Sequence, residues 1–302
     1  MDPVFIIGAG AIGKALAVCL VNEGKSVVLL RGSVDNGEMR REKIRVTLSS
    51  RQIIEAEVTI DTLSSYLNLE GLIVLCNKSY GNAALADALK GKIAYSPIVL
   101  LQNGLGVEQK FMDFPSVYRC VLFVASQPVS DTDLIFKSVA ISPIGRVSGG
   151  DEASLDNIAA FLNTPHFGFR AERDIQPVIW KKAIVNSVFN SVCPLLDTDN
   201  GIFHRYPPAL RIAEGLVAEC LRVAEEQGIN ISQKEVMDCL LLISRSSDGQ
   251  FISTLQDIRN HRPTEIATLN LAIAGMAKTE QETIRTQLLG ELILLKSQIT
   301  QS

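Results

Sequence analysis

The sequence is poor in the residues and patterns that metal sites, membrane spans and nucleic-acid interfaces need. It has 3 histidines, and its 6 cysteines include no Cys-x-x-Cys pair, so we expect no metal site. No stretch approaches the roughly 20 apolar residues that span a bilayer. The net charge is −4 without a long basic run, which argues against nucleic acid as a partner. The run from Val4 to Ile7 is too short for the apolar region of a secretion signal. We therefore expect a cytoplasmic protein with reduced cysteines and no membrane partner.

Length and composition instead indicate a globular chain with more than one domain. The 302 residues exceed the roughly 100–200 that are usual for one domain. Apolar residues make up 47% of the chain and charged residues 21%, which is enough to build cores and is unlike a disordered protein.

The first half alternates short apolar runs with helical patterns. This β-α-β rhythm predicts an α/β fold with a parallel, doubly wound sheet of the Rossmann type. A charged segment over Asp35–Lys43 is expected to be an exposed loop. The runs Val117–Ala125 and Leu134–Ile141, with turn residues between them, predict an antiparallel pair. Buried strands are expected at Val4–Ile7, Val27–Leu30, Leu72–Cys76 and Ile98–Leu101, and helices at Ala11–Asn22 and Asn82–Lys90.

From about residue 151 helical periodicity dominates, and strand signals nearly vanish. The sequence therefore predicts an N-terminal dinucleotide-binding domain over residues 1–170 and an all-helical domain over residues 171–302. Helices are expected at Leu155–Leu162, Val178–Val192, Ala209–Gln227, Lys234–Ser244, Glu265–Ala277 and Glu282–Lys296.

A glycine-rich segment, Gly8-Ala9-Gly10-Ala11-Ile12-Gly13, follows the first expected strand and opens the first helix. The spacing Gly-x-Gly-x-x-Gly is weak by itself, because glycine-rich turns also occur by chance. Between a buried strand and a helix it is much stronger. The glycines let the backbone approach a pyrophosphate, and the helix N-terminus presents unpaired N–H groups to it. We therefore expect a dinucleotide-binding loop.

The end of the second strand carries Arg31. An enzyme that uses NAD usually has Asp or Glu about 20 residues after the loop, to bind the ribose 2′-hydroxyl. A guanidinium there would instead bind a 2′-phosphate, so Arg31 favours NADPH/NADP+ over NAD. The alternative is an ordinary surface arginine.

In the expected helix over Val178–Val192, polar residues recur every four positions among apolar ones. Lys182, Asn186 and Asn190 therefore lie along one face. A lysine and two amides on a largely buried helix would suit a cleft that binds a polar substrate, because buried polar groups need partners. A solvated stripe is the alternative.

Taken together, these and further motifs resemble the ketopantoate reductase (2-dehydropantoate 2-reductase) family over nearly the whole chain. That family reduces 2-dehydropantoate to (R)-pantoate with NADPH, on the route to pantothenate and coenzyme A. The resemblance implies an enzyme with a small 2-oxo acid as its substrate. The motifs are the glycine loop with Arg31, Asn77-Lys78-Ser79-Tyr80, Gln102-Asn103-Gly104-Leu105-Gly106, Trp180-Lys181-Lys182 with Asn186 and Asn190, Asn200-Gly201, Ser253–Arg259 and Arg262-Pro263-Thr264-Glu265-Ile266.

The resemblance also implies roles for individual residues. Lys182 matches the catalytic lysine that donates a proton to the carbonyl oxygen. Glu265 matches an essential acid that acts between substrate, lysine and cofactor. Lys78 and Asn103 match residues beside the cofactor. The substrate-binding positions are Lys182, Asn186, Asn190, Asn200 and Ser253.

Some positions depart from the family pattern. Ser191 stands where a proline is usual, Ala267 where an aspartate is common, and Leu271 where a glycine is common; Asn77 replaces a residue that is often apolar or small. The alternatives are therefore a reductase of another 2-oxo acid or a non-catalytic NADPH-binding regulator. Apolar surface on the C-terminal helices would permit a homodimer.

Overall fold

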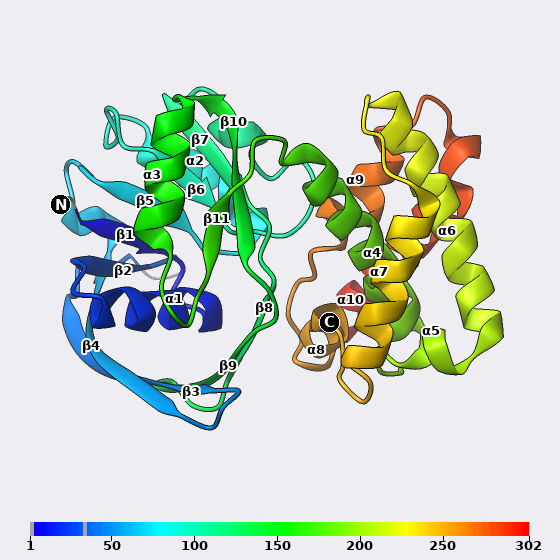
Figure 1. Ribbon diagram of the computed structural model, residues 1–302, viewed down its shortest axis with the longest axis horizontal. Helices are drawn as coiled ribbons and strands as arrows, with labels where there is room; N and C mark the ends of the chain where they lie inside the picture. The colour runs from blue at the N-terminus through cyan, green and yellow to red at the C-terminus, as the bar shows by residue number, and fades with distance from the viewer. Residues whose placement is uncertain (1–2, 33–34, 302) are drawn as a thin grey trace. The chain divides into compact units, whose positions relative to one another are not determined.

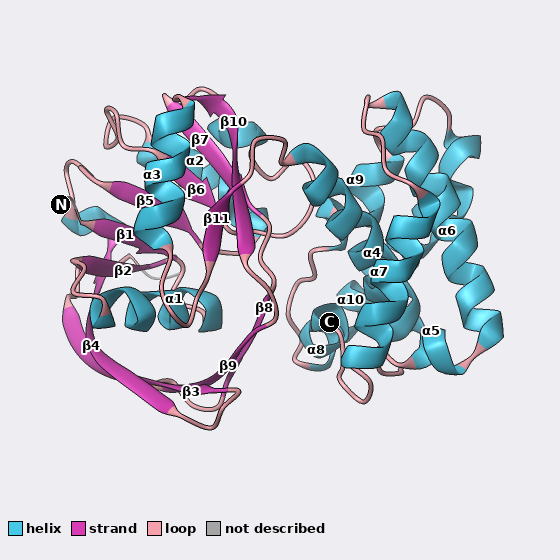
Figure 2. Ribbon diagram, in the orientation of Figure 1, coloured by secondary structure: helices cyan, strands magenta, loops and turns pink. Residues whose placement is uncertain are grey.

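The computed structural model describes residues 3–32 and 35–301, and the chain divides into two compact units. The first unit comprises Met1–Gln102 and Val107–Ile175. The second comprises Gln176–Ser302 together with the short loop Asn103–Gly106. Strands of the described residues all belong to the first unit, whereas the second is built of helices (Figures 1 and 2).

The first unit contains one sheet of eleven strands in the order β11-β10-β7-β6-β5-β1-β2-β4-β3-β9-β8. At its centre β5, β1, β2 and β4 run parallel, and β6 and β7 continue the parallel run on the β5 side. This is the predicted Rossmann-type arrangement. The bounds are β1 Val4–Ile7, β2 Val27–Arg31, β3 Arg40–Leu48, β4 Ile53–Thr62, β5 Leu72–Leu75, β6 Ile98–Leu100, β7 Ser116–Cys120, β8 Val124–Pro128, β9 Asp133–Ser138, β10 Ser142–Gly149 and β11 Phe169–Ala171.

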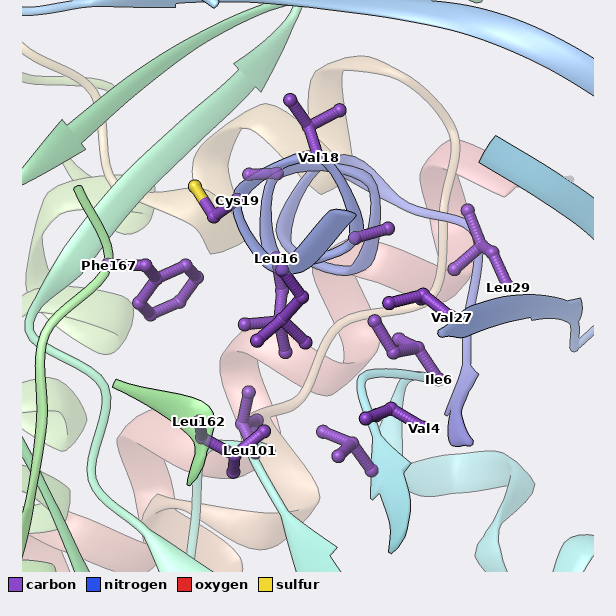
Figure 3. Packing of buried hydrophobic residues seen from close by; sticks show 14 of the residues in the cluster. Val4, Ile6, Leu16, Val18, Cys19, Val27, Leu29, Leu101, Leu162 and Phe167 are labelled. Atoms are coloured by element: carbon purple, nitrogen blue, oxygen red, sulfur yellow. The ribbon is translucent and has the colours of Figure 1, made fainter. Parts of the chain in front are cut away.

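One of the two buried apolar clusters of this unit surrounds α1 (Ala11–Asn22), whose residues are apolar apart from Lys14 and Asn22. Leu16, Val18 and Cys19 are all 2% exposed or less, and strands β2, β4 and β8 pack around the helix. Figure 3 shows Leu16 extending from α1 into this cluster, with Ile6 and Val27 on one side and Phe167 on the other. A helix that is hydrophobic all round must be buried all round, and the curled end of the sheet provides this cover. The other helices of the unit are α2 (Asn82–Leu89), α3 (Glu152–Leu162) and the short 3-10 turns η1 (Leu63–Ser65), η2 (Ser79–Gly81) and η3 (Gln109–Phe111).

The expected loop over Asp35–Lys43 is wrong from Arg40 onward, because β3 begins there and pairs antiparallel with β4. Inward-facing Ile44 and Val46 are fully buried, whereas Lys43 and Arg45, which alternate with them, are exposed. The apolar alternation in the sequence of β3 is short, and the charged residues around it favoured the prediction of an exposed loop.

The expected antiparallel pair was correct only in part. The run Val117–Ala125 is split between β7 and β8, and only β8 forms the hairpin with β9. The strand β7 instead pairs in parallel with β6 and antiparallel with β10. The strands β10 and β11 were missed. The residues after 151 are therefore not all helical, because β11 lies in the first unit and spans the expected boundary near residue 170.

The second unit is a helical bundle around α4 (Gln176–Leu195), which contacts α6, α7, α8 and α10. The expected continuous helix over Glu265–Ala277 is wrong, since a 3-10 turn and a short helix occur there. The elements are α5 Ile202–Arg205, α6 Pro207–Glu226, α7 Gln233–Ser246, α8 Ser253–Arg259, η4 Ile266–Thr268, α9 Asn270–Ala274, η5 Glu280–Thr283 and α10 Ile284–Gln301.

Candidate functional site

The three glycines of the loop after β1 each meet a different physical demand. Gly8 has a φ of +118°, and a β-carbon on it would collide with the backbone of Asn77 after β5. A β-carbon on Gly13 would collide with the carbonyl oxygen of Gly8, so this glycine lets α1 approach the strand. Gly10 is exposed, and nothing lies within 4 Å of where its β-carbon would stand. These are the demands of a tight turn, a close helix–strand contact and an open approach for a phosphate.

The N-terminus of α1 suits an anion. Its N-cap, Gly10, provides no side-chain cap, and the first turn carries no acidic residue. The N–H groups of the first turn and the positive end of the helix dipole are therefore available to a phosphate group. Ala9, Ala11 and Ile12 complete the loop with half-buried side chains. The residues present fit the pyrophosphate of a dinucleotide.

Arg31 ends β2 beside this loop. The Leu30 carbonyl accepts a hydrogen bond from the Gly8 N–H at 2.8 Å, which fixes the strand end against the loop. The Arg31 Nη2 donates to the Asn36 side chain at 2.9 Å and to the Glu38 carbonyl. Among the described residues, no partner accepts from its buried Nε. The guanidinium is thus oriented by the following loop through its Nη2.

Asp35 is the first acidic residue after Arg31 in the sequence and could compete for a ribose hydroxyl. Its carboxylate accepts from the Ser64 N–H at 2.9 Å, and hydrogen bonds from Ser64 hold the pKa of Asp35 below its usual value. The carboxylate is therefore already engaged in a hydrogen bond with the start of η1. This leaves Arg31 as the charged side chain at the strand end.

A network of buried amides supports the end of β5. The Gln102 Nε2 donates to the Asn77 carbonyl at 2.9 Å and to the Asn82 Oδ1 at 2.7 Å. The Asn82 Nδ2 donates to Gln102 Oε1 and to the Val107 carbonyl, both at 2.8 Å. These bonds fix the backbone on which Lys78, a half-buried residue, begins the turn η2.

Behind this network lies a buried ion pair that sequence reasoning did not identify. Arg119 on β7 is 2% exposed; its Nη1 pairs with Glu108, and its Nη2 donates to the Gln102 carbonyl at 3.3 Å. An arginine inside an apolar run could have indicated this ion pair, because a charged side chain is rarely buried without a partner.

In the second unit, Asn103 belongs to a loop that binds the segment after Glu265. The Leu105 N–H donates to the Thr268 carbonyl at 2.8 Å, and Gly104, with a φ of +98°, leaves no room for a β-carbon beside Thr268. Glu265 is the N-cap residue of η4, and its carbonyl accepts from the Thr268 N–H and hydroxyl, both at 3.0 Å. The structure thus brings the Asn103 loop and the Glu265 turn together.

The helix α4 aligns Lys182, Asn186 and Asn190 on one face, as predicted. The Asn190 Nδ2 donates to the Asn186 carbonyl at 2.9 Å, and the Asn190 side chain is nearly buried. The Asn190 Oδ1 accepts from the Ser253 hydroxyl at 3.4 Å and from the Thr254 N–H at 3.3 Å. Ser253, which opens α8, therefore lies beside the polar face of α4.

Asn200 is a further buried amide, 6% exposed. Its Nδ2 donates to the Ser247 hydroxyl at 3.2 Å. Its Oδ1 is buried and finds no partner among the residues that the structure describes. An unsatisfied acceptor of this kind is costly, and a ligand with a hydroxyl or N–H group would satisfy it. The contacts do not join Asn200 directly to Asn190 or Ser253.

The departures from the family pattern are accommodated locally. Ser191 is fully buried, and its hydroxyl donates to the Ser187 carbonyl at 2.6 Å, so α4 continues past it to Leu195. The Leu271 side chain lies where a β-carbon on Gly290 of α10 would stand, so that glycine makes room for it. Ala267 is exposed.

Neither a membrane span nor a metal cluster appears in the described part of the chain. No helix there is long and apolar enough to cross a bilayer. Within residues 3–32 and 35–301, no three His, Cys, Asp or Glu side chains gather in a way that could hold a metal ion.

Comparison with known families agrees with these features. The family model of the ketopantoate reductase PanE/ApbA matches residues 4–137, and the model of its C-terminal domain matches residues 174–296. The chain belongs to the ketopantoate reductase family. It is therefore an oxidoreductase by family. It is 25% identical over 279 residues to 2-dehydropantoate 2-reductase of Halobacterium salinarum, which covers 91% of this chain and 92% of that protein.

Solved structures share the fold of this ketopantoate reductase family member. A dimeric ketopantoate reductase from Staphylococcus aureus matches with a TM-score of 0.81 at 21% identity, over 99% of both chains. D-mandelate dehydrogenase, solved with NADH and anilino(oxo)acetate, matches with a TM-score of 0.83 at 22% identity, also over 99% of both chains. At these identities the likeness concerns the fold.

Proposed function

We propose that this protein reduces 2-dehydropantoate to (R)-pantoate with NADPH, the reaction that supplies pantothenate and coenzyme A synthesis. The observation that carries the proposal is the polar face of α4, where Lys182, Asn186 and Asn190 align beside Ser253 in a chain of this family. The relative from Halobacterium salinarum carries the name of this activity. The first unit, which the sequence predicts over residues 1–170, is the proposed cofactor-binding domain, and the second unit, predicted over residues 171–302, is the proposed substrate and catalytic domain.

The glycine loop and Arg31 are the proposed cofactor-binding residues, with Lys78, Asn103 and Glu265 beside the nicotinamide. Gly10 leaves open space and the uncapped N-terminus of α1 offers N–H groups, which suits the pyrophosphate. The positively charged guanidinium of Arg31 at the end of β2 suits a 2′-phosphate, which NADPH has and NADH lacks. When bound, the nicotinamide supplies a hydride to the carbonyl carbon of the substrate.

The protein's own task is to orient the substrate and to neutralise the oxygen that becomes negative. The ammonium of Lys182 stabilises this oxygen and transfers a proton to it, an effect worth roughly 10²–10⁴ in rate. The amides of Asn186, Asn190 and Asn200 and the Ser253 hydroxyl bind the carboxylate and hydroxyl groups of the substrate. The Glu265 carboxylate orients the ammonium group of Lys182 and the bound substrate relative to each other.

The homodimer is also a proposal. The relative from Staphylococcus aureus is dimeric, and this chain has exposed apolar residues on its helical unit. A dimer would not by itself change the reductase chemistry.

The decisive experiment follows NADPH and NADH oxidation by the purified protein with 2-dehydropantoate. Parallel assays use a branched aliphatic 2-oxo acid and an aryl 2-oxo acid. We expect turnover with 2-dehydropantoate and NADPH to exceed the others by at least about tenfold in kcat/KM, which corresponds to about 1.4 kcal/mol of transition-state binding. A preference for another 2-oxo acid would refute the proposed substrate and keep the reductase. Binding of NADPH without turnover of any substrate would refute the reductase.

A further inference from the structure

A cavity of about 860 Å³ opens in the first unit, at the edge of the sheet opposite the glycine loop. Its lining includes Lys25, shortly before β2, Leu72, the first residue of β5, and Pro97, directly before β6. These residues stand at the amino ends of parallel strands, whereas the glycine loop follows the carboxyl end of β1. We call this hollow the edge cavity. Its volume is that of a ligand pocket, usually about 300–1,000 Å³, and the proposed cofactor loop takes no part in it.

Hydrogen bonds hold one wall of the edge cavity in place. The Ser96 hydroxyl donates to the Leu69 carbonyl at 2.7 Å and accepts from the Gly71 N–H at 3.1 Å. The Leu72 N–H donates to the Pro3 carbonyl at 3.1 Å. The segments before β5 and β6 are thereby fixed to each other and to the start of β1. A ligand would meet a preformed site, which lowers the entropic cost of binding.

Aromatic and aliphatic side chains make up most of the remaining lining. Ile158 of α3 is buried, and Phe161 of the same helix is half-buried. Tyr95, shortly before β6, is 88% exposed, so most of its ring faces water. A ligand that covers Tyr95 and Phe161 would remove this apolar area from water, and an aromatic ligand would add ring–ring contacts. The edge cavity therefore suits an apolar body.

Lys25 is the one basic residue among those that line the edge cavity in the described chain. Its ammonium lies 5.0 Å from the centroid of the Phe161 ring and donates to the Phe161 carbonyl near the end of α3. This contact uses one of three N–H donors, and the described residues provide no acceptor for the other two. Burial lowers the pKa of the Lys25 side chain, because its charged form is partly removed from water. A carboxylate in the cavity would supply the missing acceptor and a compensating charge.

Glu70 also lines the edge cavity and carries the opposite charge. Its side chain is exposed, so water screens its field, whereas the Lys25 side chain is half-buried. The lysine therefore interacts more strongly with a bound charge, and the cavity favours an anion over a cation.

We propose that the edge cavity is a second ligand site, which binds a small molecule with an aromatic or branched apolar body and one carboxylate that pairs with Lys25. The site lies outside the proposed cofactor loop and the polar face of α4. Its occupation needs no reductase turnover, so the two proposals stand or fall separately.

The first test measures binding to the purified protein by isothermal titration calorimetry. We expect 4-tert-butylbenzoate to bind with a dissociation constant of about 0.1 mM. The neutral 4-tert-butylbenzamide and the cationic 4-tert-butylbenzylamine should bind at least about tenfold more weakly, because neither can form the charged hydrogen bond with Lys25. Absence of binding by the acid up to about 1 mM would overturn the proposal, as would equal or tighter binding of the amide or the amine.

Variants of the lining test the site itself. We expect Lys25→Met to weaken binding of the acid about 10–100-fold. Lys92→Met is the matched control, since Lys92 likewise donates to a backbone carbonyl of this unit, that of Tyr66, but does not line the cavity. Ala160→Trp should also abolish binding by filling the cavity, whereas Ala153→Trp, at another exposed position of α3, should not. Unchanged affinity in Lys25→Met or Ala160→Trp would overturn the proposal.

A fluorescent reporter places the bound acid. In a Tyr95→Trp variant the new indole lines the cavity, so its emission should change on titration with the same dissociation constant as in calorimetry. The wild-type chain has one tryptophan, Trp180, which is 4% exposed in the second unit and should not respond. The Lys182→Met variant should bind the acid with unchanged affinity. A response of Trp180 alone, or loss of binding in Lys182→Met, would move the acid to the proposed substrate site and overturn the second site.

Discussion

The α-carbon of Gly13 faces the carbonyl oxygen of Gly8 so closely that a β-carbon on Gly13 would stand well within 3.0 Å of that oxygen. The first turn of α1 therefore packs directly on the end of β1. Gly10, three residues earlier, has open space where its β-carbon would be. The same motif thus contains one glycine that the fold requires and one that the fold does not require, which we propose serves a bound ligand.

Alanine substitutions should separate these two roles. Gly13→Ala forces the loop or helix to shift, and we expect it to lower stability by roughly 3 kcal/mol or more. Gly10→Ala should keep the melting temperature within about 2 °C, because nothing is displaced and its φ of −80° suits alanine. It should weaken NADPH binding at least about tenfold by filling the phosphate approach. Thermal unfolding and fluorescence titration with NADPH measure both effects, and a Gly10→Ala variant with unchanged affinity would remove the loop from the cofactor site.

Removal of the proposed proton donor should affect turnover and spare cofactor binding. We expect Lys182→Met to lower kcat by roughly 10²–10⁴ while the dissociation constant for NADPH changes less than about threefold. Lys181→Met is the matched control, since Lys181 is the adjacent half-buried lysine on another face of α4. Steady-state kinetics at saturating NADPH make the comparison. Similar losses in both variants would indicate a structural effect on α4 and contradict the role given to Lys182.

Arg31 should determine the choice between the two nicotinamide cofactors. We expect Arg31→Ala to raise the KM for NADPH by about 10–100-fold, as loss of a charged hydrogen bond costs about 1.5–3 kcal/mol, and to leave the KM for NADH nearly unchanged. Arg173→Ala is the control, because Arg173 pairs with Asp156 of α3 rather than with the loop. An equal rise for both cofactors would mean that Arg31 only supports the fold.

The buried pair of Arg119 and Glu108 should contribute mainly to stability. Arg119→Met leaves the Glu108 carboxylate buried without its partner, and we expect a loss of about 3–5 kcal/mol in the free energy of unfolding. The double variant Arg119→Met/Glu108→Leu should recover most of this loss, because it removes both charges. Urea unfolding monitored by circular dichroism provides the values. A double variant no more stable than Arg119→Met alone would show that the unpaired Glu108 carboxylate is not the cause of the loss.

Local patterns predicted the elements that bear most of the candidate site. The strand–glycine loop–helix sequence from Val4 to Asn22 and the polar face of α4 were both predicted with bounds close to those observed. These features depend on the spacing of residues within one segment, which the backbone periodicity fixes. The break of the expected helix after Glu265 could not be predicted in this way, since the turn η4 is held by the distant Asn103–Gly106 loop.

Local periodicity and glycine geometry were sufficient to predict the Gly-x-Gly-x-x-Gly loop, the parallel strands around it and the alignment of Lys182 with its asparagines. Contacts between distant segments were needed to show that Gln102 supports the end of β5, that the β3–β4 hairpin extends the sheet, and that α10 turns its leucines outward. Those outcomes depend on partners far away in the chain. A segment's own pattern identifies its apolar face, but only its neighbours decide whether that face is covered.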